Sequence, residues 1–159
     1  MSEPTGPSEV SGRATRPIDQ DYADRVGREF PGGTYELAPW RVWLVADALL
    51  DDPYDPHPHP VLAWMAGVAG MGMTWEDLFD WFDARASDGP MFGEHRTTLH
   101  APLETGATYR VSGRVVSVDR KVGRRAGAMD VVGYELDLHL GERHVARCFN
   151  SIVFPRRDA

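Results

Sequence analysis

The sequence predicts an α+β domain in which an antiparallel sheet wraps around one apolar helix. Three observations carry this prediction. The regular segments before residue 83 are mostly helical in pattern. The segments after residue 90 alternate between apolar and polar residues, as strands do. The helix expected over residues 60–73 contains no charged side chain. A run of consecutive strands forms an antiparallel sheet, and a helix that is apolar on all sides is buried.

The length and composition fit one globular domain. The chain has 159 residues, of which 42% are hydrophobic and 26% charged. These values exclude wholesale disorder, a collagen-like repeat and a coiled coil. Residues 1–20 are rich in Ser, Pro, Gly and charge, so we expect a disordered tail there and a single domain over residues 21–159.

Charge and cysteine content restrict the partners and the compartment. The net charge of -7 disfavours a broad surface for nucleic acid or anionic membranes. The longest apolar span, residues 61–73, is far shorter than the roughly 20 residues that cross a bilayer. Cys148 is the only cysteine, so an internal disulfide and a thiolate metal site are both excluded. The N-terminus lacks a secretory signal, so we expect a cytoplasmic protein. Because no thiolate site is possible, we also expect no bound metal.

The first half of the chain predicts a short strand and three helices. Residues 22–29 are weakly helical, and residues 34–37 form a strand before a turn into a helix that begins at Pro39. Pro60 opens the apolar helix, and its glycines suggest close approach by another backbone or a ligand. Thr74 and Asp77 resemble a capping box for a third helix that extends to residue 82.

The second half predicts four strands. They cover residues 92–100, 109–118, 132–140 and 145–154, and the third alternates most clearly between apolar and polar residues. Val115 and Val116 interrupt the alternation of the second strand, which predicts a β-bulge.

The segment over residues 51–60 (DDPYDPHPHP) is the most unusual in the chain. Its four prolines exclude a helix or a central strand, and it concentrates three carboxylates and two imidazoles. Such side chains on one loop are suited to acid–base chemistry. A solvated proline-rich loop decorated by His57 and His59 is the simpler interpretation, and it stays open.

Several short motifs occur in an order that resembles a known family. They are VGREFP at 26–31, TYEL at 34–37, GEH at 93–95, HAPLETG at 100–106 and VGRRAG at 122–127. Over about residues 24–156 the chain resembles the MaoC-like (3R)-hydroxyacyl thioester dehydratases, in the branch similar to the dehydratase domain of type I fatty-acid synthase. The resemblance implies a hot-dog fold, in which the sheet encloses the central apolar helix.

The resemblance also implies an activity and a catalytic pair. The family hydrates enoyl thioesters or dehydrates 3-hydroxyacyl thioesters with an Asp and a His on one loop, without a metal or redox cofactor. Asp52 and His57 have the family's Asp-x-x-x-x-His spacing. His57 would then exchange the alpha proton and Asp52 would orient or protonate the departing water. The Val61 and Leu62 amides at the helix start would stabilise the enolate oxygen.

A second alignment of the same loop remains open. The family motif reads Asp-x-Asn-Pro-x-His, whereas this chain lacks the Asn and has a displaced Pro. Aligned as a shortened Asn-Pro-x-Tyr-x-Asp-Pro loop, the segment places Tyr54 where a catalytic His would stand. That pattern resembles the non-catalytic subunit of heterodimeric dehydratases, which shapes the acyl tunnel while another chain supplies the catalytic pair.

The expected carrier and partners complete the prediction. Arg124 and Arg125, at the basic hairpin tip, suit the phosphates of coenzyme A or a phosphopantetheine carrier, although a hairpin kept soluble by charge also explains them. We expect an acyl thioester substrate and a homodimer or a heterodimer with a second hot-dog subunit. An acyl-CoA thioesterase is disfavoured, because residues 61–73 lack the carboxylate that hot-dog thioesterases commonly place on this helix.

Overall fold

A computed structural model describes residues 22–124 and 127–156. The expected tail over residues 1–20 lies outside the described residues. The elements follow one another as η1 (Ala23–Arg25), β1 (Gly33–Glu36), α1 (Pro39–Leu49), α2 (Val61–Gly70), α3 (Trp75–Asp80), η2 (Ala86–Asp88), β2 (Met91–Leu99), β3 (Thr108–Gly123), β4 (Gly127–Leu140) and β5 (Arg143–Arg156). No helix in the described ranges is both long and apolar enough to span a bilayer.

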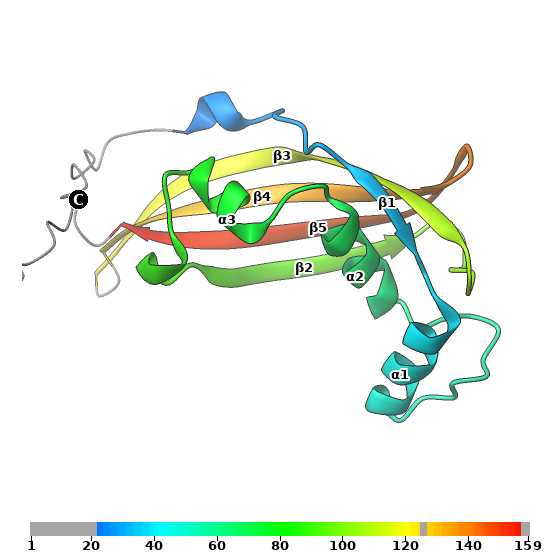
Figure 1. Ribbon diagram of the computed structural model, residues 1–159. Helices are drawn as coiled ribbons and strands as arrows, with labels where there is room; N and C mark the ends of the chain where they lie inside the picture. The colour runs from blue at the N-terminus through cyan, green and yellow to red at the C-terminus, as the bar shows by residue number, and fades with distance from the viewer. Residues whose placement is uncertain (1–21, 125–126, 157–159) are drawn as a thin grey trace, which may run out of the picture.

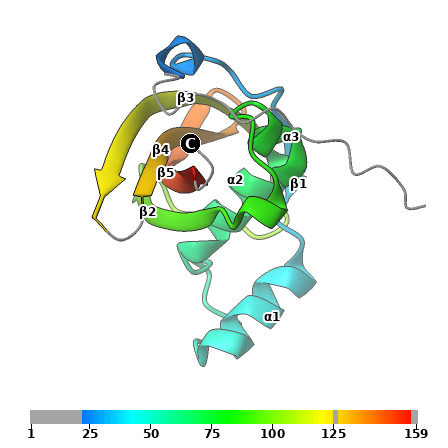
Figure 2. The same ribbon diagram turned by 90° about the vertical axis from the view of Figure 1, so that its left-hand side faces the viewer.

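All five strands join one antiparallel sheet in the order β1-β3-β4-β5-β2. The sheet curves around α2, which contacts every one of its strands (Figures 1 and 2). The predicted α+β architecture with a sheet wrapped around an apolar helix is therefore confirmed. The predicted bulge is also present, because the β3–β4 register shifts between Val115 and Ser117.

The glycines of α2 lie where the helix meets the sheet. A Cβ built on Gly70 would stand 2.5 Å from the Val111 Cγ2 atom, and one on Gly67 would stand 3.4 Å from Leu136. The helix is shorter than expected and ends at Gly70 instead of Met73. Its enclosure is also incomplete in this chain, because Val61, Trp64 and Met65 are only partly buried and Ala69 is exposed.

The helix starts follow the local chemistry of the sequence. Pro39 occupies the first turn of α1, where its missing N–H costs nothing. The Thr74 hydroxyl accepts a hydrogen bond from the Asp77 amide, and the Asp77 carboxylate accepts one from the Thr74 amide, so the predicted capping box caps α3. Residues 22–29 contain the 3-10 turn η1 and an isolated β-bridge from Glu29 to Arg114, so the weak helix predicted there is limited to one turn.

A buried ion-pair cluster holds the β3–β4 hairpin against the end of β5. Asp130 is 1% exposed, and its carboxylate accepts hydrogen bonds from Arg120 and Arg156. A second bond from Arg156 to the Phe82 carbonyl oxygen ties this end of the sheet to the segment after α3.

Candidate functional site

The proline-rich loop over residues 51–60 joins α1 to α2 and is held by its own side chains. The Asp52 carboxylate accepts a hydrogen bond from the Tyr54 amide at 2.9 Å, and the Asp55 carboxylate accepts one from the His57 amide at 2.7 Å. Aspartate side chains readily accept such hydrogen bonds from nearby backbone amides. These bonds hold the loop in place of the regular backbone hydrogen bonds that its prolines prevent. The Asp51 carboxylate likewise accepts a hydrogen bond from the Asp52 amide at 3.0 Å, so all three loop carboxylates bind the loop's own backbone.

The amides predicted to hold an enolate oxygen are already hydrogen-bonded. The Val61 N–H donates to the His59 Nδ1 atom at 3.2 Å, and the Leu62 N–H donates to the His59 carbonyl oxygen at 3.0 Å. Because Nδ1 is the acceptor, the neutral ring carries its proton on Nε2. A substrate oxygen would have to displace these contacts before either amide could bind it.

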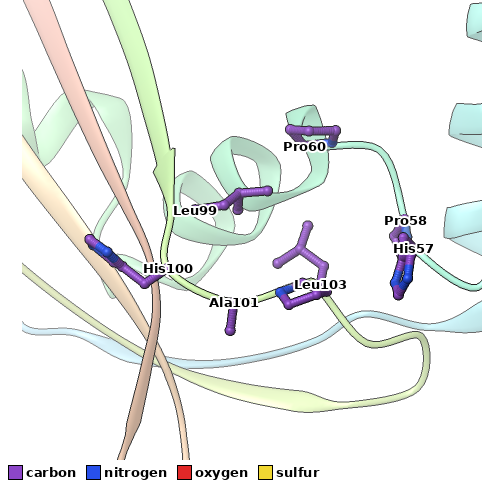
Figure 3. A pocket seen from close by; sticks show the side chains of 8 residues that line it. His57, Pro58, Pro60, Leu99, His100, Ala101 and Leu103 are labelled. Atoms are coloured by element: carbon purple, nitrogen blue, oxygen red, sulfur yellow. The ribbon is translucent and has the colours of Figure 1, made fainter.

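A pocket of about 430 Å³ opens beside the start of α2. One side is formed by the loop and the other by the segment that follows β2 (Figure 3). The lining residues are His57, Pro58, Pro60, Leu99, His100, Ala101, Pro102 and Leu103. Apolar side chains predominate, so the pocket suits an apolar ligand with a reactive polar group.

The structure brings only one of the predicted pair to this pocket. His57 lines the pocket, whereas Asp52 and Tyr54 are not among the lining residues. Tyr54 is 83% exposed. Within the described ranges Asp52 and His57 form no hydrogen bond or ion pair with each other. The predicted roles of all three residues remain predictions.

His100 is a pocket residue that the sequence prediction did not include, but its ring points away from His57 (Figure 3). The imidazole packs against His144 with 4.5 Å between ring centroids. His144 in turn bonds the Asp137 carboxylate through Nε2 at 2.7 Å. His100 therefore contributes mainly its backbone side to the pocket, while its ring belongs to a polar cluster.

That polar cluster is electrostatically stabilised. Burial tends to raise the pKa of Asp137, but hydrogen bonds from Arg147 and the nearby charges outweigh it and the pKa is lowered. Cys148 lies 0% exposed and has a raised pKa because of burial, so it stays a thiol. In the described part of the chain no three His, Cys, Asp or Glu residues are grouped so as to hold a metal ion.

The end of β3 that leads to Arg124 lies at the opposite end of the sheet from the start of α2 and the pocket beside it (Figure 1). β3 has 16 residues between this end and the pocket end, which at ~3.3 Å per residue corresponds to ~50 Å along the strand. Arg124 of the same chain is therefore remote from His57. Arg125 lies outside the described residues.

Comparison with known proteins connects this geometry to a fold family. No protein-family model matches the chain. The rhizopine catabolism protein MocC of Rhizobium meliloti is 36% identical over 93 residues, which cover 46% of this chain and 28% of that protein. This chain therefore spans less than a third of the length of that curated relative.

Solved structures match over most of the chain. A chain of the ChsH1-ChsH2 complex from Mycobacterium tuberculosis has a TM-score of 0.65 at 14% identity, covering 81% of this chain and 85% of that one. The HadBC (3R-hydroxyacyl-ACP dehydratase) complex from the same organism has a TM-score of 0.56 at 16% identity, covering 79% and 92%. A MaoC-like dehydratase from Phytophthora capsici has a TM-score of 0.66 at 12% identity, covering 86% and 51%.

These matches establish the fold. The chain has the hot-dog fold that MaoC-like dehydratases share, as the order of short motifs predicted. At identities of 12 to 16% they show the architecture alone, so the activity has to be argued from the site.

Proposed function

We propose that this chain is a hydratase or dehydratase of acyl thioesters, acting on (3R)-hydroxyacyl or enoyl groups carried by coenzyme A or phosphopantetheine. The observation that carries the proposal is the position of His57 in a largely apolar pocket beside the start of α2. The pocket would bind the acyl chain. An imidazole is the side chain best suited to accept and release a proton near neutral pH. The hot-dog fold adds a structural context in which this chemistry is found.

In the proposed dehydration, His57 accepts the proton alpha to the thioester carbonyl. The electron pair released moves onto the thioester carbonyl as an enolate and then forms the C2–C3 double bond as the C3–O bond breaks. The departing hydroxyl leaves as water with a proton from Asp52, which is reprotonated from solvent while His57 releases its proton, or, where Asp52 only orients it, with the proton that His57 has taken. Hydration runs through the same steps in reverse. The proposal requires the exposed Asp52 to reach the pocket when substrate is bound, and the enolate oxygen to replace the loop contacts of Val61 or Leu62.

A second candidate function follows from the separation of Asp52 and His57. If the loop does not bring them together, the chain would serve as an acyl-binding subunit beside a catalytic hot-dog partner, as the Tyr54 alignment implies. The ChsH1-ChsH2 and HadBC structures are complexes of two differently named chains, which supports a partner of this kind. A cytoplasmic location, expected from the single Cys148, belongs to the same proposal.

Hydration of crotonyl-CoA and longer enoyl-CoAs by the purified chain tests the proposal. We expect turnover by the native protein and a loss of about 10²- to 10⁴-fold in kcat for His57→Ala. His144→Ala is the matched control, because its imidazole bonds the Asp137 carboxylate and does not line the pocket. Undiminished turnover in His57→Ala would remove His57 as the base. An inactive native chain that increases the activity of a catalytic hot-dog subunit would establish the acyl-binding function instead.

The carrier is tested separately at the hairpin tip. Because Arg124 is remote from His57 of its own chain, the two arginines could bind the carrier only from a second copy. If Arg124 and Arg125 of that copy bind carrier phosphates, replacing both with Ala should raise KM for CoA thioesters and leave kcat unchanged. N-acetylcysteamine thioesters lack these phosphates and supply the control, since their KM should not change. An unaltered KM for the CoA substrates would assign the two arginines to solubility alone.

A further inference from the structure

The pocket beside α2 has a floor formed by one buried side chain. Leu99, at the end of β2, lines the pocket and is 38% exposed, whereas Leu103 lines it and is only 2% exposed. The Leu103 side chain stands between Leu99 and the proline-rich loop (Figure 3). It also packs within the hydrophobic core of the domain. A chain that enters the pocket from solvent therefore meets Leu103 where the pocket ends against the core.

The wall that carries Leu103 is fixed by hydrogen bonds on both sides of this residue. Before it, the amides of residues 100–101 donate to the Val145 carbonyl oxygen at 2.8 and 3.2 Å. After it, the Glu104 amide donates to the phenol oxygen of the fully buried Tyr109 at 2.7 Å. Because these bonds hold the wall to β3 and β5, it cannot retreat to admit a longer ligand.

The opposite wall is held as well. Pro58 and Pro60 have backbone angles restricted by their rings. Between the two aspartate turns and α2, the His57 amide donates to the Asp55 carboxylate at 2.7 Å. With both walls held, the side chains that line the pocket decide how large a ligand fits.

The volume of the pocket leaves room for a short acyl chain. Its value of about 430 Å³ lies towards the lower end of the ~300–1,000 Å³ that small-molecule sites span. The same space must hold the thioester carbonyl and the reacting carbons beside His57. Carbons for which the pocket has no room would stay in water, where they gain no hydrophobic stabilisation.

We propose that Leu103 determines the acyl-chain specificity of the pocket, and that the substrates are short-chain acyl thioesters of about hexanoyl length or less. This assignment rests on the proposed function, because it places the thioester beside His57. The end of the acyl chain contacts the Leu103 side chain. A smaller residue at this position joins the vacated core space to the pocket and admits a longer chain.

Saturated acyl-CoAs test the size of the pocket separately from catalysis, because they have no double bond to hydrate. Titration calorimetry with butyryl- to decanoyl-CoA should give dissociation constants that fall by about fourfold for each methylene up to hexanoyl-CoA and then level off. With Leu103→Ala, octanoyl-CoA should bind about tenfold more tightly than hexanoyl-CoA, because two more methylenes are buried. Leu103→Val removes one carbon and should shift the preference in the same direction, so it serves where the Ala variant does not fold.

Two control variants separate pocket size from general loosening of the core. Leu78→Ala removes the same carbons from a buried leucine of α3 that does not line the pocket. Leu103→Met keeps the side-chain volume at the floor nearly constant. Both variants should show the same dependence on chain length as the native protein.

The outcomes for the pocket and for the activity are distinguishable. Native affinity that keeps increasing through decanoyl-CoA would overturn the size limit, even if enoyl-CoAs are hydrated. Unchanged chain-length preference in folded Leu103→Ala and Leu103→Val proteins would remove Leu103 as its determinant. A native protein that shows the expected preference but does not hydrate crotonyl-CoA would support the size limit and contradict the hydratase activity.

Discussion

The Nδ1 atom of His59 accepts a hydrogen bond from the Val61 amide at 3.2 Å and thereby fixes the entry from the proline-rich loop into α2. Amides in the first turn of a helix have no partner within the helix, and a side-chain acceptor stabilises them. His59 therefore supports the helix beside which the pocket opens.

Replacement of His59 by Ala should lower the free energy of unfolding by about 1 kcal/mol, as for the loss of a helix cap. Urea unfolding followed by circular dichroism measures the change. His57→Ala is the control, since among the described residues its imidazole makes no hydrogen bond, and we expect a change within about 0.5 kcal/mol. Equal destabilisation by both substitutions would contradict the capping assignment.

The two glycines on the buried face of α2 should respond differently to Ala. At Gly70 the new Cβ would stand 2.5 Å from the side chain of buried Val111, and overpacking of this kind costs about 1–3 kcal/mol. At Gly67 the nearest atoms are 3.4 Å away, so the gain in helix propensity of up to ~1 kcal/mol should offset any strain. Thermal unfolding of both variants shows which is less stable. A Gly70→Ala protein as stable as the Gly67→Ala protein would contradict the close packing of Gly70 against Val111.

Asp130→Asn should destabilise the sheet by about 3 kcal/mol, because it removes the buried negative charge that binds the guanidinium groups of Arg120 and Arg156. Asp119→Asn, at an exposed position on β3, is the matched control with an expected effect below about 0.5 kcal/mol. Chemical denaturation at neutral pH measures both. A small effect at Asp130 would show that the cluster contributes little net stability.

Asp130 should also affect unfolding in acid. Burial tends to raise the pKa of Asp130, but the hydrogen bonds from Arg120 and Arg156 outweigh it and hold the pKa below its ordinary value of 3.8. Its contribution is therefore complete above pH 3.8 and disappears as the pH falls through the folded-state pKa. Denaturation midpoints measured from pH 5 to pH 2 should fall less steeply for Asp130→Asn than for the native protein.

His139 should cause a separate loss of folding stability at a pH closer to 7. Desolvation, Arg110 and His144 lower its pKa below 6.5, so the folded protein binds a proton less readily than the unfolded chain. Stability is then highest above pH 6.5 and decreases as the pH falls from there towards the folded-state pKa. We expect a smaller decrease between pH 7.5 and pH 5.5 for His139→Gln, measured by urea unfolding. The same decrease in both proteins would rule out His139 as its source.

The regular elements could be predicted because their signals are local. Pro39 is the first residue of α1, Pro60 directly precedes α2, and Thr74 and Asp77 form a cap. The alternation of residues 132–140 identifies a strand without knowledge of its neighbours. The ends of the elements were predicted less accurately. The strands β3, β4 and β5 run beyond their predicted limits because pairing with neighbours extends them through residues of weak alternation.

The site was only partly predictable, because its geometry depends on distant segments. The sequence of residues 51–60 does not predict that His57 lines a pocket with residues 99–103 or that Asp52 lies outside that pocket. The spacing of two residues fixes their relative positions on a helix or a strand, but four prolines leave this loop without a regular period. The charge of Arg124 predicts binding to carrier phosphates, but the length of β3 separates this residue from the pocket of its own chain.

The sequence by itself determined the α+β plan, the apolar helix, the bulge and the loop that concentrates acid–base residues, since each follows from local periodicity or from the backbone limits of proline and glycine. Only the tertiary structure decided that β2 is the long open edge, that His59 occupies the Val61 amide and that His57 alone of the predicted pair lines the pocket. These relationships arise from strand order and from contacts between residues far apart in the chain, which local patterns do not encode.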